Sequence, residues 1–367
     1  MPIFDQGYQR WHGRFRGRAW RCWAVTWQGV KTQFKGRWIK LLLGVSIMPA
    51  LCLVAFLVFW SLLEQQAPII QPLLGLLQGL PEEVRQGPKN YRVMMWTLAF
   101  NFFFMVQLFF SMVLVLIVGP DLISKDLRFN ALPLYLSRPL RRVDYFVGKL
   151  GVIAFYLALV TTGPVLLAYT LGVAFSLDPA IIQDTWHILV GAVVWSLVVM
   201  VSAGTLMLAI SSLSRNSRYV SILFAAFWLV LSIASGSVWS ALPRNQDQTR
   251  PDWPRVISYT NNLWRIGEVC INTAAAWEQW DRLMEALEKR TAAAQAGLPP
   301  GMRRSPSGRT PQIRVGAQPG QPTMRAQERQ TLRQTFPWWW SAATLGGLFA
   351  CSVLILTSRV RSLDRLK

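Results

Sequence analysis

The chain has 367 residues, of which 52% are hydrophobic and 15% are charged, and it contains 18 tryptophans. This composition excludes a disordered chain and argues against an ordinary soluble domain. The 38 lysines and arginines against 18 aspartates and glutamates give a formal net charge of +20, and almost all of it lies outside the long apolar stretches. The four cysteines, Cys22, Cys52, Cys270 and Cys351, form no CxxC pair and no cysteine–histidine cluster, which argues against a disulfide framework or a zinc site.

The first segment, residues 1–38, is basic and predicts a helix that lies on the cytoplasmic face of a membrane. Aromatic and apolar side chains recur at spacings of 3 and 4, while basic side chains lie off that strip. Such a helix places its rings at the level of the lipid headgroups. It either anchors and orients the first span, or it flanks a surface where a soluble partner docks. Its predicted interfacial residues are Trp20, Trp23, Trp27, Lys31, Phe34 and Trp38.

Six apolar stretches are each long enough to cross the hydrocarbon core of a bilayer as a helix. A helix satisfies its backbone hydrogen bonds within the segment, as lipid requires. The sequence therefore predicts an all-α integral membrane protein with six transmembrane helices, five of them within residues 39–242. The predicted spans are residues 39–63, 93–119, 150–175, 188–213, 219–242 and 338–357.

The basic residues also predict the orientation of the chain. In the short connections and the two ends of the chain, 20 lysines and arginines fall on one side of the membrane and three on the other. Because positive segments stay in the cytoplasm, both termini are predicted to be cytoplasmic in a multi-pass protein of the cell (inner) membrane. The connection at 243–337 would lie outside, and it is too long to be counted in this rule.

The predicted spans lack the residues that an energy source would need. No ionisable residue lies in the middle of a span; Glu64 and Arg92, for example, fall at span ends, which disfavours a proton pump or an ion-coupled transporter. The Gly148–Lys149 pair lacks the earlier glycine of a phosphate-binding loop. No catalytic motif and no metal-ligand cluster is present either. Either the chain transports nothing actively, or another subunit supplies the energy.

The second span carries three polar residues, Asn101, Gln107 and Ser111, among several phenylalanines. Two interpretations are open. The residues line a pathway for a lipid-like or aromatic cargo, or they hold helices together by hydrogen bonds, which is the commoner use of asparagine and glutamine in spans.

The connection between the second and third spans, residues 120–149, has an ordered pattern. An Ile-Ser-x-acid stretch is followed by a leucine-rich turn, a Ser-Arg-Pro, a further arginine, an aromatic residue and a Gly-Lys pair. These positions are Ile123, Ser124, Asp126, Leu132, Leu136, Ser137, Arg138, Pro139, Arg142, Tyr145, Gly148 and Lys149. This connection resembles the signature of the ABC-2 family of ATP-binding-cassette permeases.

A short cytoplasmic helix joined rigidly to two spans can enter a cleft on a soluble motor and turn the motor's movement into tilting of those spans. We expect Ile123, Leu127 and Leu132 to fill that cleft. We expect Lys125, Asp126 and Arg128 to give it polar specificity. Ser124 belongs to the same segment. The basic residues after it, Arg138, Arg141, Arg142 and Lys149, either hold the turn near anionic headgroups or only enforce topology.

The resemblance implies the membrane subunit of an ABC-2 type transporter, with six spans and an interfacial helix before the first. It implies a separate ABC ATPase subunit on which ATP is hydrolysed with Mg; no cofactor and no metal are expected on this chain. The permease is expected to pair with itself as a homodimer or with a paralogous permease in the lipid bilayer. The family favours export.

Two other classes remain as alternatives. A passive six-span channel or membrane scaffold would have no use for the coupling segment. A membrane enzyme would need paired acids or Cys/His clusters at one depth, which the sequence lacks. Nothing along the spans identifies the cargo.

The extracytoplasmic connection at 243–337 divides into two parts. Apolar residues recurring at spacings of 3 and 4 predict an amphipathic helix over 258–296, on the outer leaflet or at the mouth of the transporter. By the family resemblance, 256–271 is the nearest counterpart of the short re-entrant helices that follow the fifth span. The Pro-, Gly-, Gln- and Arg-rich tract at 297–335 is predicted to be disordered. It lacks interleaved aromatic residues, so no nucleic-acid partner is expected.

The last segment, residues 338–367, holds the sixth span and a basic cytoplasmic tail. Three tryptophans at 338–340 are typical of the aromatic belt at a membrane–water interface. The sixth span is therefore predicted to begin at the outer interface.

Overall fold

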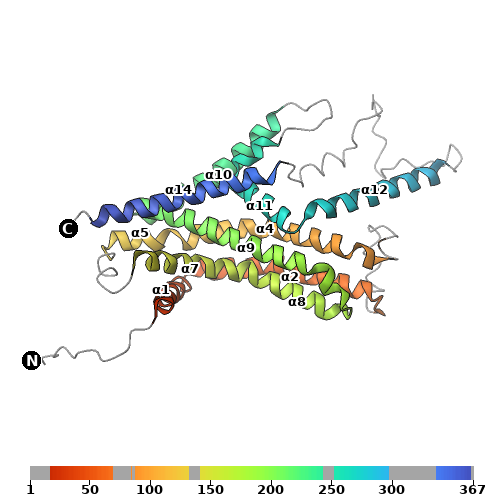
Figure 1. Ribbon diagram of the computed structural model, residues 1–367, viewed down its shortest axis with the longest axis horizontal. Helices are drawn as coiled ribbons and strands as arrows, with labels where there is room; N and C mark the ends of the chain where they lie inside the picture. The colour runs from red at the N-terminus through yellow and green to blue at the C-terminus, as the bar shows by residue number, and fades with distance from the viewer. Residues whose placement is uncertain are drawn as a thin grey trace, which may run out of the picture.

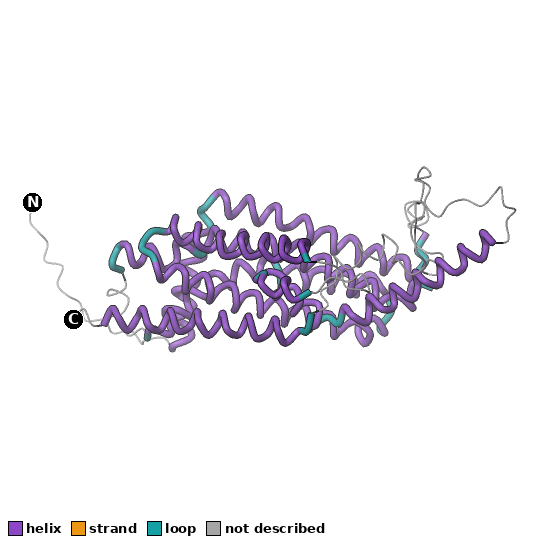
Figure 2. The backbone as a smooth tube through the Cα atoms, turned by 90° about the horizontal axis from the view of Figure 1, so that it is seen from above, coloured by secondary structure: helices purple, strands orange, loops and turns teal. Residues whose placement is uncertain are grey.

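The computed structural model describes residues 17–68, 84, 87–131, 141–242, 252–296 and 336–364. Within these ranges the chain is helical and contains no strand. Most of the long helices run side by side along one long axis (Figure 1), and a view turned by 90° shows the same alignment (Figure 2). Among the described residues, six helical segments are long and apolar enough to cross a membrane. The long axis is therefore the expected membrane normal.

The described elements follow one another with short connections. Their bounds are α1 (Arg18–Gln33), α2 (Arg37–Glu64), η2 (Pro88–Tyr91), α4 (Arg92–Val118), α5 (Pro120–Arg128), α7 (Arg142–Val160), α8 (Thr162–Ser176), α9 (Ala180–Leu213), α10 (Ser217–Ala241), η3 (Trp253–Ile257), α11 (Tyr259–Cys270), α12 (Thr273–Ala296) and α14 (Trp338–Asp364). The six candidate spans lie in α2, η2 through α5, α7 with α8, α9, α10 and α14. The predicted all-α class and the predicted number of spans are confirmed.

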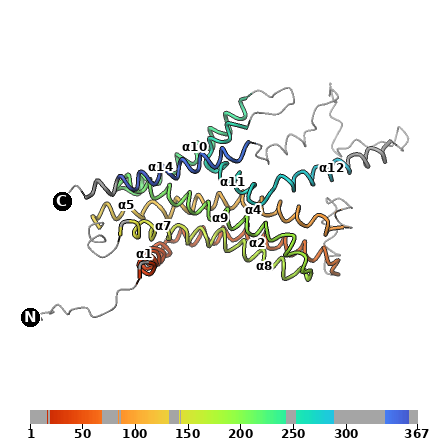
Figure 3. Tube along the Cα trace, in the orientation of Figure 1, coloured from red at the N-terminus to blue at the C-terminus, as the bar shows by residue number. Residues whose placement is uncertain are grey.

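Different helices lie at the two ends of the bundle. Helices α1 and α5 and the C-terminal part of α14 lie toward one end, whereas α12 and the connection between α8 and α9 lie toward the other (Figure 3). Following the orientation predicted from the basic residues, we call the first the inner end and the second the outer end.

Helices α4 and α9 form the centre of the bundle. Trp96, Phe100 and Phe104 of α4 are fully buried, as is Trp195 of α9. Phe104 stacks on Trp195 with ring centroids 4.0 Å apart, a geometry that adds to the gain from burying the two rings. The remaining spans surround this pair and keep large apolar side chains on the outside, as lipid-facing helices do.

The third span is two helices rather than the single predicted one. Helix α7 ends at Val160 and α8 begins at Thr162, two residues before Pro164. A proline has no N–H, so the carbonyl four residues earlier, that of Val160, loses its donor within the helix. Pro164 therefore favours a break at this point of the span.

The predicted interfacial helix is shorter than expected. Helix α1 ends at Gln33, and a turn at Gly36 precedes α2. Trp38 therefore belongs to the first span and not to the interfacial helix, which corrects the prediction. Phe34 is the residue directly after α1.

The predicted amphipathic helix over 258–296 is also two helices. Helix α11 ends at Cys270, and Asn272 takes a left-handed conformation with φ of 53° before α12 begins. Helix α11 lies inside the bundle against α4, α9 and α14, and α12 packs on α4. The prediction of a single helix on the outer leaflet or at the mouth is wrong for α11, which enters the bundle.

Candidate coupling site

Helix α5 is fixed to the inner end of α9 by a serine. The backbone N–H groups of Ile123 and Ser124 donate to Ser211 Oγ at 3.3 and 3.1 Å. The hydroxyl of Ser211 donates in turn to the Pro120 carbonyl at 2.9 Å. Ser124 Oγ lies 3.0 Å from Ser217 Oγ at the start of α10. These groups have lost their contact with water, so breaking any of these hydrogen bonds would leave a buried polar group without a partner, which is costly. The bonds therefore hold α5 firmly against the bundle.

The buried face of α5 corrects part of the predicted contact surface. Ile123 is 2% exposed and Ser124 is fully buried, so Ile123 does not fill a cleft on a partner. Leu127 is half-buried, whereas Lys125 and Arg128 are exposed. Leu132 lies outside the described residues.

An exposed aromatic residue at the tip of α5 was missed by the sequence analysis. Phe129 is 73% exposed, and the Arg128 guanidinium lies 5.7 Å from its ring centroid. Its position right after a short amphipathic helix is the signal that could have found it. The surface that α5 leaves open is basic and aromatic.

Asp126 joins α5 to α7. Its Oδ2 accepts a hydrogen bond from the Tyr145 hydroxyl at 2.6 Å and forms an ion pair with Lys149 Nζ at 2.7 Å. The side chains of Asp126 and Lys149 are 15% and 12% exposed. The acid, the aromatic residue and the lysine of the sequence pattern therefore meet at one point. Asp126 pairs within the chain, and its predicted polar contact with a partner stays a prediction.

Gly148 lets α1 approach α7. A Cβ atom at this position would lie 2.8 Å from Val25 Cβ and 3.2 Å from the Cys22 carbonyl oxygen. The Gly148 carbonyl accepts a hydrogen bond from Thr26 Oγ1 at 2.9 Å. Any side chain here would separate α1 from α7, so the glycine of the pattern has a packing role.

The rest of the sequence pattern is described in part. Arg142 is the first residue of α7, and the Arg141 N–H donates to Asp144 Oδ2 at 3.3 Å, which satisfies a donor at the helix start. Leu136, Ser137, Arg138 and Pro139 lie outside the described residues.

A protein-family model described as ABC-2 family transporter protein matches residues 23–272. The chain belongs to the ABC-2 transporter family. The matched region runs from α1 to the end of α11, so it contains five spans, α5 and the α5–α7 junction. No curated protein matches the chain.

In this ABC-2 protein the aromatic residues of α1 lie on its exposed side. Trp23 and Trp27 stack with ring centroids 5.9 Å apart, and Lys31 Nζ lies 5.4 Å from the Trp27 ring. Trp20 is 49% exposed. Contact of these rings with lipid headgroups remains a prediction.

The three polar residues of the second span are used inside the ABC-2 protein. Asn101 Oδ1 accepts a hydrogen bond from Trp264 Nε1 at 3.0 Å, and Gln107 Nε2 donates to the Val160 carbonyl at 2.6 Å. Ser111 Oγ donates to the Gln107 carbonyl at 2.8 Å. All three side chains are buried. Asn101 and Gln107 therefore make interhelical contacts, and a role of the three residues in a cargo pathway stays a prediction.

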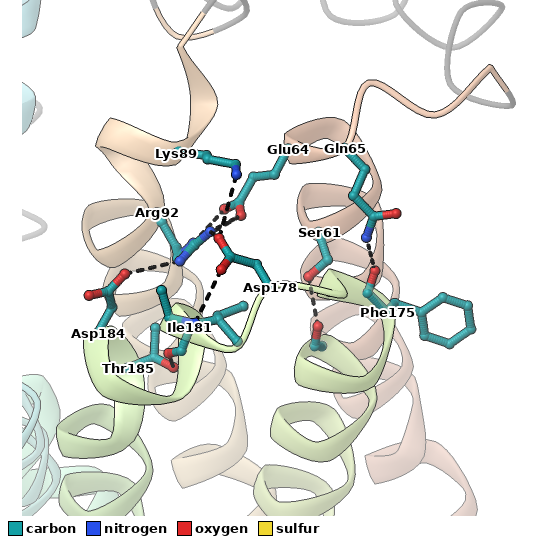
Figure 4. Close-up of polar contacts among 12 residues, drawn as sticks. Ser61, Glu64, Gln65, Lys89, Arg92, Phe175, Asp178, Ile181, Asp184 and Thr185 are labelled. Atoms are coloured by element: carbon teal, nitrogen blue, oxygen red, sulfur yellow. Dashed lines mark hydrogen bonds and ion pairs between the residues drawn. The ribbon is translucent and has the colours of Figure 1, made fainter.

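An ion-pair network at the outer end was not anticipated. Arg92 is 3% exposed and donates to Glu64 Oε2 at 2.6 Å, to Asp178 Oδ2 at 2.8 Å and to Asp184 Oδ2 at 3.0 Å (Figure 4). Lys89 Nζ lies 3.5 Å from the same Asp178 oxygen. The network joins α2, α4, the α8–α9 connection and the first turns of α9. Glu64 and Arg92 are therefore buried partners, whereas charges at span ends are ordinarily solvated.

The network makes a prediction about pH. The hydrogen bonds from Arg92 and from the Ala180 N–H hold the pKa of Asp178 below its ordinary value. A carboxyl group with a lowered pKa stabilises the folded state above its unfolded pKa, about 3.9, and loses that effect as the pH falls through the folded value. The difference in unfolding midpoint between the native protein and Asp178→Asn should stay constant from about pH 8 to about pH 5 and shrink only below about pH 4. A difference that already vanishes at neutral pH would contradict this assignment.

Proposed function

We propose that this ABC-2 protein is the permease subunit of a transporter whose energy comes from ATP hydrolysis on a separate ATPase subunit docked at α5. The observation that carries the proposal is the attachment of α5 to three spans at once. It continues α4 through Gly119, binds Ser211 of α9, and binds Lys149 of α7 through Asp126. A force applied to α5 is therefore transmitted to α4, α7 and α9 together.

The finer parts of the proposal follow from the sequence and the family. ATP and Mg bind to the partner, because this chain has no phosphate-binding loop. Six spans make half of a transporter, which pairs with a second copy or a paralogous permease. Export is the proposed direction, and the inner end faces the cytoplasm of the cell (inner) membrane. The exposed Lys125, Arg128 and Phe129 are the proposed contact surface for the ATPase.

The test is to co-express the chain with a candidate ABC ATPase subunit and to reconstitute the purified complex in lipid nanodiscs. We expect the ATPase to co-purify with the chain, and Phe129→Asp to abolish that association while the unfolding midpoint of the permease is unchanged. A passive channel or a scaffold would purify without an ATPase and would be indifferent to Phe129→Asp.

The Asp126–Lys149 pair gives a further expected result. Asp126→Lys places two ammonium groups together and removes charge-assisted bonds that contribute about 1–3 kcal/mol. We expect it to destabilise the permease and to disconnect ATP hydrolysis on the partner from movement of the spans attached to α5. The double variant Asp126→Lys/Lys149→Asp should recover most of both properties, as measured by unfolding and by the ATPase rate of the complex.

The matched control for this pair is Asp121→Asn, which removes the exposed ion pair of α5 with Lys125. An exposed pair within a helix contributes at most about 1 kcal/mol. A charge-swapped double variant no better than Asp126→Lys would show that the pair does not join α5 to α7.

A further inference from the structure

Both halves of the third span pack on α9, but their side-chain bonds go to different helices. The inner half, α7, is attached to α1 through the Tyr156 hydroxyl, which donates to the Val30 carbonyl at 2.9 Å, and to α5 through Lys149. The outer half, α8, is attached to α2, where Ser61 Oγ donates to the Gly172 carbonyl at 2.8 Å and Gln65 donates to the Phe175 carbonyl (Figure 4). A break in the span therefore separates the coupling end from the outer end.

A side chain from a third helix supplies the hydrogen bond that the break removes. Pro164 cannot donate to the Val160 carbonyl, and Gln107 Nε2 of α4 donates to that carbonyl at 2.6 Å instead. Gln107 is fully buried. Thr161 continues the chain across the break, with its N–H and its hydroxyl both donating to the Leu157 carbonyl at 2.7 and 2.8 Å. The break is thus hydrogen-bonded but has no helical backbone bond at Val160.

This arrangement is less favourable than an uninterrupted helix would be. A residue with an N–H at position 164 could complete the helix without help from α4. The Oε1 atom of Gln107 is also buried without a hydrogen-bond partner among the described residues, which costs free energy. Departures of this kind from local consistency are expected where function requires them.

Gln107 also connects the break to the coupling helix. It lies on α4, which α5 extends with only Gly119 between them. Movement of α5 therefore acts on α7 directly through Asp126 and on the break through α4. The Gln107 amide can keep its hydrogen bond to the Val160 carbonyl while the angle between α7 and α8 changes. A backbone hydrogen bond within a continuous helix would hold that angle fixed.

We propose that the third span flexes at Val160–Pro164 during transport, and that Gln107 is the positioning residue that holds this joint while α7 tilts against α8. The inner half moves with α5, and the outer half stays with α2 and the Arg92 network. This inference rests on the proposed function, because it takes the driving movement from the ATPase at α5.

The first test is a double-mutant cycle on the purified permease. Gln107→Leu should lower the unfolding midpoint, because it leaves the Val160 carbonyl buried without a donor. Pro164→Ala should leave the midpoint equal or higher, because the alanine N–H can bond to Val160. In the Pro164→Ala background, Gln107→Leu should lose at least half of its effect. Equal effects of Gln107→Leu in both backgrounds would overturn the proposal.

The second test measures movement across the joint in the complex with the ATPase. With the four native cysteines replaced by serine, spin labels at Val147 on α7 and Leu167 on α8 lie roughly 30 Å apart along the span, and both native side chains are exposed. We expect their distance to change between ADP and ATP with vanadate, and Pro164→Ala to reduce that change at least twofold. A label pair at Leu51 on α2 and Leu167 on α8 should not change.

The controls separate this inference from the proposed function. Pro49 lies inside α2, which stays continuous, so Pro49→Ala should leave the nucleotide-dependent distance change intact. If the complex hydrolyses ATP and the Val147–Leu167 distance is the same in both nucleotide states, the joint is overturned and the proposed function stands. If no ATPase complex forms, both fail.

Discussion

Replacing Arg92 with methionine is expected to lower the free energy of unfolding by about 3–5 kcal/mol, the range for removing one partner of a buried ion pair. The loss is large because Glu64, whose side chain is 1% exposed, would be left in a buried site without its cationic partner. Asp178 and Asp184 are 26% and 47% exposed, so water can solvate them when Arg92 is gone. The measurement is reversible denaturation of the purified permease in detergent.

Two matched variants test this explanation. Lys89→Met removes a cation that is 62% exposed and 3.5 Å from Asp178, and an exposed pair of this kind contributes at most about 1 kcal/mol. The double variant Arg92→Met/Glu64→Met removes both buried charges, so it should be more stable than Arg92→Met alone. If the double variant lost as much stability as Arg92→Met and Glu64→Met lose together when each is made alone, the network would not act through the buried pair.

The sequence predicts the spans well because their signal is local. Apolar length is a property of the segment itself, and each predicted span overlaps an observed helix. Proline is less informative. Pro49 and Pro164 both lie in apolar stretches, yet α2 stays continuous at Pro49 while the third span breaks before Pro164, so a proline alone does not determine where a helix ends.

Burial of charges could not be predicted, because it depends on tertiary partners. Arg92 and Glu64 stand at span ends, where charges are ordinarily solvated. Their burial requires α2, α4 and the α8–α9 connection to meet, and nothing in the local sequence specifies this meeting. The third connection, which contains two aspartates and no lysine or arginine, was the available signal.

The ABC-2 pattern was found from the sequence, but the roles of its residues were not. Asp126 and Lys149 are 23 positions apart and pair only because α7 folds back beside α5. Ile123 is apolar and lies on a short helix, which favoured a contact with a partner. Hydrogen bonds to Ser211 of α9 instead hold that face of α5 against the bundle. A pattern fixes which residues occur together, and only packing decides which surfaces they leave open.

Gly191→Ala is expected to displace α11 from α9 and to lower the free energy of unfolding by about 1–3 kcal/mol or more, as overpacking does. A Cβ atom at Gly191 would lie 2.2 Å from the Cys270 carbonyl oxygen and 2.7 Å from its carbonyl carbon. Because these are backbone atoms, no rotamer change can relieve the contact. The end of α11 must move, although Trp195 Nε1 still donates to the Leu263 carbonyl at 2.9 Å near its middle.

The control is Gly236→Ala on α10, where an added Cβ meets nothing within 4 Å. Exchanging glycine for alanine in an open helix position stabilises by up to about 1 kcal/mol, so the two variants should shift stability in opposite directions. A second measurement follows Cys270 itself. With Cys22, Cys52 and Cys351 replaced by serine, Gly191→Ala should increase the rate at which maleimide labels Cys270, because its half-buried thiol moves away from α9. Unchanged stability and labelling would mean that α11 is not held against α9, and its place inside the bundle would then lack this support.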